Sequence, residues 1–285
     1  KNDRLTFEYQ EGIARALGYK DQDGLLAVEQ FLSQVHASMA SVKSLHRSFV
    51  FTHFPGSRKN DVGSGRPEDL SAPFHMDQGE IYFPSAVAIL SDPLLLLEIF
   101  AEAARTGRPL ALESKRLIRE FLHLIDDSLR MSQRAARSFE LILKTSNACD
   151  VLDQMLETGF LCVFIPEFEP VKDRVQFDHY HLFPVGRHLL QTLRHLKTLH
   201  RQRDLLLTDI FLDLQDPEPL FLAALFHDIG KTGKDHARRG AHLARNILKR
   251  FGYDRKRMDP VPFLIHHHLL LAEARAVPGA EYILG

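Results

Sequence analysis

The sequence of 285 residues predicts an all-α fold, and three observations lead to that fold class. Apolar residues recur every three to four positions along most of the chain, which is the spacing of amphipathic helices. Glycine and proline fall mainly between these periodic segments, where such residues end or begin helices. No segment indicates a convincing sheet, and only residues 79–84 (GEIYFP) indicate a short extended piece.

The first half of the chain is predicted to be a helical bundle. Residues 25–54 form a long amphipathic helix, and the next segment, 55–73, is a polar loop rich in glycine, proline and serine. The apolar face of the long helix consists of Val28, Phe31, Leu32, Val35, Met39 and Val42. Further helices are expected at 92–107, 113–129, 134–144 and 147–158.

The second half resumes the helical pattern after a connector at 163–178. Helices are expected at about 181–203, 218–228, 235–251 and 260–270. The connector is either a domain border or a loop inside one unit. As a border it would separate an N-terminal bundle, residues 1–165, from a second helical domain, residues 166–285.

Composition and charge exclude several classes of function. The formal net charge is −1, so we expect neither a nucleic-acid surface nor a surface for acidic membranes. No secretory leader or run of membrane-spanning length is apparent, and we expect a fragment of a longer protein. Cys149 and Cys162 lie in apolar segments and are expected to be buried free thiols, which suits the cytoplasm.

Histidine is abundant, with 16 residues, and one histidine stands in an unusual position. The pair His227–Asp228 directly follows the apolar run Leu222–Phe226. Burying an unpaired ionisable group is costly or forces the group to become neutral, so this pair needs a partner. A metal ion is a candidate, since neutral imidazole is the commonest protein metal ligand.

Other histidines are placed where they could join this pair. His188 lies at the edge of an apolar helix face, and His236 is the first helical residue after Asp235. Residues 266–268 are three successive histidines, of which at most two can face one site, because helical neighbours differ by about 100°. The predicted metal ligands are His188, His227, Asp228, His236, His267 and His268.

This set of nitrogen and oxygen atoms predicts one or two divalent ions, Mn, Fe, Mg or Zn, rather than calcium. Two ions would lower the pKa of a bridging water and hold a phosphoryl oxygen, which is the chemistry of phosphoester hydrolysis. We expect Asp228 and Lys231 to be catalytic. Lys231 could also bind the substrate phosphate as a point charge.

At these residues the chain resembles the HD superfamily of metal-dependent phosphohydrolases. The stretches VFIPEFEPVKDRVQFDHYHLFPVGRHLLQTL (163–193), ALFHDIGKTGKDHARRGAHLA (224–244) and IHHHLLLAEA (265–274) are similar to the HD region of one family. That family is the bifunctional PII uridylyltransferase/uridylyl-removing enzymes. Residues 19–42 and 94–118 resemble the helical region between its nucleotidyltransferase and HD domains.

The resemblance implies an all-α HD domain that removes uridylyl (UMP) groups from the PII nitrogen-signalling protein. Water would attack the phosphorus of a phosphodiester that joins UMP to a tyrosine. On this chain the resemblance matches the six predicted ligands to metal-binding positions. It also matches Asp178, Tyr180 and His181 to the stretch before the first ligand, where we expect them to bind substrate together with Lys231.

The chain departs from the family pattern at several points. Gly186 and Arg187 replace acidic residues before the first ligand, and no counterpart of the last aspartate appears before Gly285. A nucleotidyltransferase motif is also missing, so no transferase activity is expected. Two alternatives therefore stay open: another HD-type nucleotide phosphohydrolase, or a catalytically inactive regulatory HD bundle.

Overall fold

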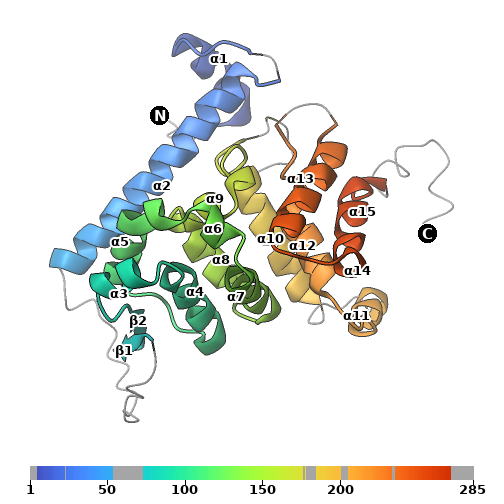
Figure 1. The fold of residues 1–285 in the computed structure, drawn as a ribbon. Coiled ribbons are helices and arrows are strands. Elements are labelled where there is room, and N and C mark those ends of the chain that lie inside the picture. Colours follow the sequence, from blue (N-terminus) through green and yellow to red (C-terminus); the bar gives the residue numbers. More distant parts are fainter. Residues whose placement is uncertain are drawn as a thin grey trace.

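The computed structural model describes residues 5–22, 24–53, 73–175, 177, 184–199, 205–232 and 235–270. Regular structure in these ranges is almost entirely helical, so the predicted all-α fold is confirmed (Figure 1). None of the helices in these ranges has the length and apolar character that crossing a membrane requires.

The elements before residue 170 are mostly short helices. They are α1 (Phe7–Ala16), α2 (Ala27–His53), α3 (Ala86–Ser91), α4 (Leu95–Thr106), α5 (Leu112–Phe121), α6 (Asp127–Arg130), α7 (Gln133–Lys144), α8 (Ala148–Glu157) and α9 (Phe160–Phe164). Two 3-10 helices span Leu122–Leu124 and Pro166–Phe168. The strands β1 (His75–Asp77) and β2 (Glu80–Tyr82) form an antiparallel hairpin. The extended piece expected at 79–84 is therefore β2.

The elements after residue 170 carry the predicted ligands. They are α10 (Val185–Lys197), α11 (Leu205–Leu212), α12 (Glu218–Phe226), α13 (His236–Arg250), α14 (Arg255–Met258) and α15 (Pro260–His266). In this half α10 packs on α12, and α15 packs on both α12 and α13. These contacts bring together helices that lie far apart in the sequence.

One hydrophobic core runs through both halves of the molecule. The rings of Phe139 (α7), Phe164 (α9) and Phe251 (after α13) lie against one another, with centroids 5.3–5.7 Å apart. Ile165 and Phe168, in the predicted connector, are fully buried. This part of the connector thus belongs to the core, which continues across position 165.

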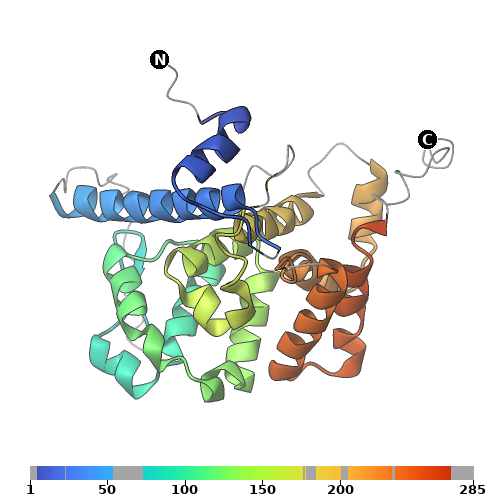
Figure 2. The ribbon, with the colours of Figure 1, turned by 90° about the horizontal axis from the view of Figure 1, so that it is seen from above.

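A smaller second core holds the N-terminal arm of the molecule. Its buried members are Ala14, Val28, Phe31, Leu32 and Val175. They join α1 to the first turns of α2 and to the segment that precedes α10. Figure 2 shows α2 running along one face of the helical body.

Polar contacts tie the ligand-bearing helices to the first half. Arg194 of α10 donates to Asp150 and Asp153 of α8 at 2.9 and 3.0 Å. Glu218 at the start of α12 is buried and accepts hydrogen bonds from Arg257 at 2.8 and 2.9 Å. It also lies 3.0 Å from the ammonium of Lys144 on α7. The positions of α10 and α12 are thus fixed from the N-terminal side.

The helix predicted over 113–129 is interrupted in the structure. The sequence predicted a continuous helix over 113–129, but α5 ends at Phe121 and α6 starts at Asp127. The carboxylate of Asp126 accepts a hydrogen bond from the Leu129 backbone N–H, so it caps a new helix rather than continuing the old one. The two cysteines are free and buried, as expected, and burial raises the pKa of Cys162 to about 12.

Candidate metal centre

The His227–Asp228 pair lies in the turn that ends α12. This helix is apolar on all sides, as a buried helix is, and its last residues Leu225 and Phe226 are not exposed. The next four residues form a turn in which the Lys231 N–H donates to the Asp228 carbonyl. The apolar helix therefore carries the pair into the interior, where Asp228 is only 3 % exposed.

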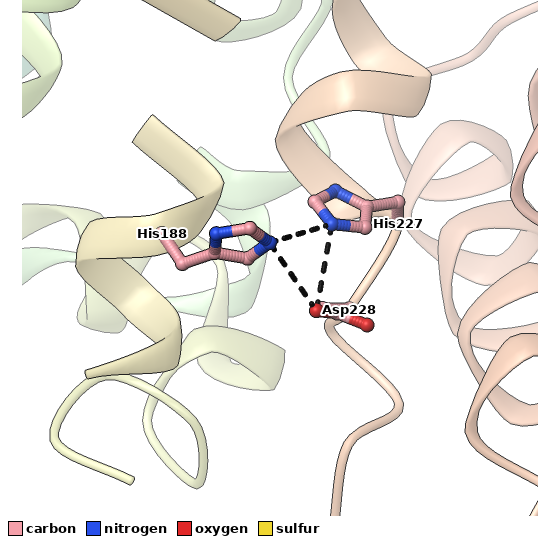
Figure 3. Close-up of side chains that lie close together, drawn as sticks. All are labelled: His188, His227 and Asp228. Carbon is pink, nitrogen blue, oxygen red and sulfur yellow. Dashed lines mark hydrogen bonds and ion pairs between the residues drawn. The ribbon is translucent and has the colours of Figure 1, made fainter. Parts of the chain in front are cut away.

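Three side chains form the first group of potential ligands (Figure 3). His188 Nε2, from α10, lies 3.1 Å from His227 Nε2 and 3.6 Å from Asp228 Oδ2. His227 Nε2 lies 3.4 Å from the same oxygen. Nitrogen ligands about 2.0–2.1 Å from an ion are separated from each other by roughly 3.0–3.4 Å, so the spacing of these atoms fits a shared ion.

A second group uses the other oxygen of the same carboxylate. His236 Nε2, at the start of α13, lies 3.6 Å from Asp228 Oδ1, and His268 Nε2, just after α15, lies 3.7 Å from it. The ligand atoms of each group lie within 4.8 Å of one another. Each oxygen of the Asp228 carboxylate thus faces two histidines, an arrangement that could hold one or two ions.

Backbone carbonyls orient two of the histidines. His227 Nδ1 lies 3.0 Å from the Ala224 carbonyl, and His268 Nδ1 lies 2.7 Å from the Ile265 carbonyl. When Nδ1 donates its proton to a carbonyl, the Nε2 lone pair is left for a metal. Both Nε2 atoms lie near Asp228, which is the orientation that a metal ligand requires.

The protonation states also fit a cation. Burial would raise the pKa of Asp228, but the hydrogen bond from His227 and the charge of Lys231 outweigh it, so the pKa falls well below its usual range. Burial lowers the pKa of both His236 and His268. The centre therefore combines a carboxylate that favours its ionised form with two histidines, His236 and His268, that favour their neutral form. Asp228 Oδ1 is buried, and none of the described residues donates a hydrogen bond to it, so this oxygen fits a metal ion.

Close backbone contact joins the turn to α13. A Cβ added at Gly230 would lie 2.4 Å from both the Gly240 nitrogen and the His236 carbonyl oxygen. Only glycine fits at this distance. The contact sets the position of α13, and hence of His236, relative to Asp228.

The remaining predicted site residues lie as follows. Lys231 Nζ points inward, 2.9 Å from Asp228 Oδ2. Of the two adjacent histidines, the structure brings His268 into the centre but not His267, which is exposed and packs against Phe263 and His266. Asp178, Tyr180 and His181 lie outside the described residues.

Comparisons with known proteins agree with this geometry. Residues 185–282 match the family model of the HD domain, and residues 1–50 match a model described as GlnD PII-uridylyltransferase. Residues 185–282 are therefore similar to HD domains. The match begins with α10, the helix of His188, and spans all the ligands of both groups.

Curated relatives extend the similarity to nearly the whole chain. A bifunctional uridylyltransferase/uridylyl-removing enzyme of Ruegeria pomeroyi is 32 % identical over 281 residues, which is 95 % of this chain. Enzymes with the same name from Pseudomonas putida strain W619 and Azotobacter vinelandii are 30 % and 32 % identical over 95 % of the chain. The chain is a relative of these enzymes. It spans about a third of their length, 31 % in each of the three.

Proposed function

We propose that this chain hydrolyses phosphodiester bonds in a reaction that depends on a divalent metal ion. One observation carries the proposal: the Asp228 carboxylate is buried, and each of its two oxygens faces two histidines. The donor set favours Mn, Fe, Mg or Zn, in one or two copies. When bound, such an ion supplies Lewis-acid stabilisation of a phosphoryl oxygen and makes water more acidic.

The residues of the chain have distinct tasks in this proposal. His188 and His236 are the most exposed of the ligands, with side chains 36 % and 26 % exposed, so substrate approaches from their side. His227 and His268 are held by carbonyls and keep their geometry during turnover. Lys231 offsets the charge of Asp228 from within the turn.

The substrate we propose is the uridylylated PII protein. The names of the relatives include uridylyl removal, and the description of the family model for residues 1–50 includes PII. In the reaction the oxygen of water bonds to phosphorus, and the bond from phosphorus to the tyrosine oxygen breaks. One proton of the water goes to the tyrosine oxygen and the other to solvent, which leaves free tyrosine and UMP. We place this reaction in the cytoplasm, where Cys149 and Cys162 would stay reduced.

The test is release of UMP from uridylylated PII in the presence of manganese. The wild type is compared with Asp228→Asn, which keeps the shape of the side chain but removes its charge. Asp259→Asn is the matched control, because Asp259 is exposed and paired with Arg245 at 2.7 Å, outside both groups. We expect release by the wild type and the control, and none by Asp228→Asn.

Other results would favour the alternatives. Hydrolysis of free nucleotides or cyclic dinucleotides without release of UMP from PII would indicate a different HD hydrolase. Absence of any hydrolysis with Mn, Fe, Mg or Zn would indicate a regulatory bundle instead.

A further inference from the structure

The rim of the metal centre carries an arginine that the sequence patterns did not single out. Arg239 follows His236 by three positions on α13, so the two side chains lie on neighbouring positions of one helix face. Its Nη1 donates a hydrogen bond of 2.8 Å to Thr232 Oγ1, one residue beyond Lys231. A guanidinium group is thus held beside the turn that carries Asp228.

Close contact between the turn and α13 fixes the position of the Arg239 backbone. Arg239 directly precedes Gly240, whose nitrogen would be only 2.4 Å from a Cβ at Gly230. The helix is therefore in direct contact with the turn at the position next to Arg239. This contact, together with the hydrogen bond to Thr232, anchors the arginine at two points.

The two cations at the turn face different ways. Lys231 is 15 % exposed, and its ammonium lies 2.9 Å from Asp228 Oδ2, so its charge is directed into the centre. Arg239 is exposed. One of the five N–H donors of its guanidinium is used in the hydrogen bond to Thr232. A planar guanidinium offers paired donors that match two oxygens of a phosphoryl group.

We propose that Arg239 is a substrate-orienting residue that binds the non-bridging oxygens of the phosphodiester at the rim of the centre. The hydrogen bond from Arg239 to Thr232 positions the arginine side chain. The arginine thereby makes the site specific for anionic phosphodiesters. This inference rests on the proposed function, since it assigns the residue that presents the substrate to the same centre.

The experiment compares steady-state hydrolysis of bis(p-nitrophenyl) phosphate by the manganese-loaded chain and its variants. Arg239→Ala should lower kcat/KM about 10- to 100-fold, mainly through KM, because a charge-assisted hydrogen bond to substrate is lost. Arg239→Lys should restore part of the loss, and Thr232→Val should cause a smaller one. Arg238→Ala removes the same charge from the adjacent exposed position and should change kcat/KM by less than about twofold.

Manganese binding and the unfolding temperature are measured for each variant. A raised KM in Arg239→Ala, with manganese affinity and unfolding temperature unchanged, supports the proposal. Equal effects of Arg239→Ala and Arg238→Ala, or loss of manganese from Arg239→Ala, would overturn it while leaving the proposed function intact.

A wild type that hydrolyses nothing would refute the proposed function, and binding of UMP then decides the role of Arg239. Weaker binding of UMP in Arg239→Ala than in Arg238→Ala would still support the role. Equal binding of UMP by the two variants would overturn it.

Discussion

The contact between Gly230 and α13 allows a quantitative test of the geometry of the centre. In Gly230→Ala the new Cβ would lie 2.4 Å from the Gly240 nitrogen and from the His236 carbonyl oxygen. Ordinary van der Waals contact starts at 3.4 Å, so the start of α13 must retreat by about 1 Å. Overpacking of this kind costs about 1–3 kcal/mol of folding free energy.

The displacement would act on one ligand group and spare the other. His236 belongs to α13 and moves away from Asp228 Oδ1, whereas His188 and His227 lie on other elements. We therefore expect manganese titration by calorimetry to show that Gly230→Ala loses the binding that depends on His236 and keeps the binding by His188 and His227. The free energy of unfolding should fall by the amount given above.

Gly12→Ala is the matched control for this substitution. Gly12 lies within α1, and a Cβ there would meet nothing within 4 Å. Alanine favours a helix over glycine by up to about 1 kcal/mol, so this variant should be as stable as the wild type or more stable, with unchanged metal binding. If Gly230→Ala also kept the stability and stoichiometry of the wild type, the reasoning about this contact would be refuted.

Three further predictions follow from the structure. His268→Ala should lose metal binding by the second group, whereas His267→Ala should keep it, as measured by manganese titration of both variants. Equal binding by the two variants would contradict the assignment of His268 as a ligand. Glu218→Gln should cost about 1–3 kcal/mol in chemical denaturation, because it weakens buried contacts with a lysine, an arginine and a tyrosine. Glu113 belongs to an exposed ion pair, so Glu113→Gln should lower the free energy of unfolding by less than about 0.5 kcal/mol. Equal losses of stability in Glu218→Gln and Glu113→Gln would contradict this prediction. The metal-free protein should lose stability as the pH falls below about 6.5, the range in which histidines of the unfolded chain take up protons. Burial lowers the folded-state pKa of His236 and His268, so in this pH range the unfolded chain binds more protons at these residues than the folded chain does. The free energy of unfolding, measured by denaturation at about pH 5.5 and about pH 7.5, should therefore be lower at pH 5.5. A higher free energy of unfolding at the lower pH would contradict this prediction.

Much of the centre could be predicted from the sequence because the signal is local. An apolar run that ends in His227–Asp228 forces an ionisable pair into the interior, and helical periodicity places His188 near a buried face. These arguments need only neighbouring residues. They predicted all five residues of the two groups, His236 and His268 included, together with His267, which lies outside both groups.

Features that depend on contacts between distant segments could not be predicted in the same way. The choice between His267 and His268 depends on how α15 ends, and adjacent residues give no signal for it. Gly186 departs from the family pattern, and the structure gives a reason: a Cβ there would lie 2.7 Å from the backbone of Lys172. The connector carries charged residues along the sequence, but Ile165 and Phe168 are fully buried in the core that residues of both halves form.

Short helices were also missed where the pattern is brief. Neither α1, at Phe7–Ala16, nor α11, at Leu205–Leu212, is among the helices predicted from the sequence. Helices of two or three turns contain too few apolar repeats to establish a face, and their stability comes mostly from packing.

Metal binding at Asp228 underlies every role proposed for the centre, since both groups use its carboxylate. The decisive measurement is a manganese titration of the metal-free chain and of Asp228→Asn by isothermal calorimetry. We predict that the wild type binds manganese and that Asp228→Asn, which remains folded, does not. Equal binding by the two proteins would contradict the account, as would a wild type that binds no manganese, iron, magnesium or zinc.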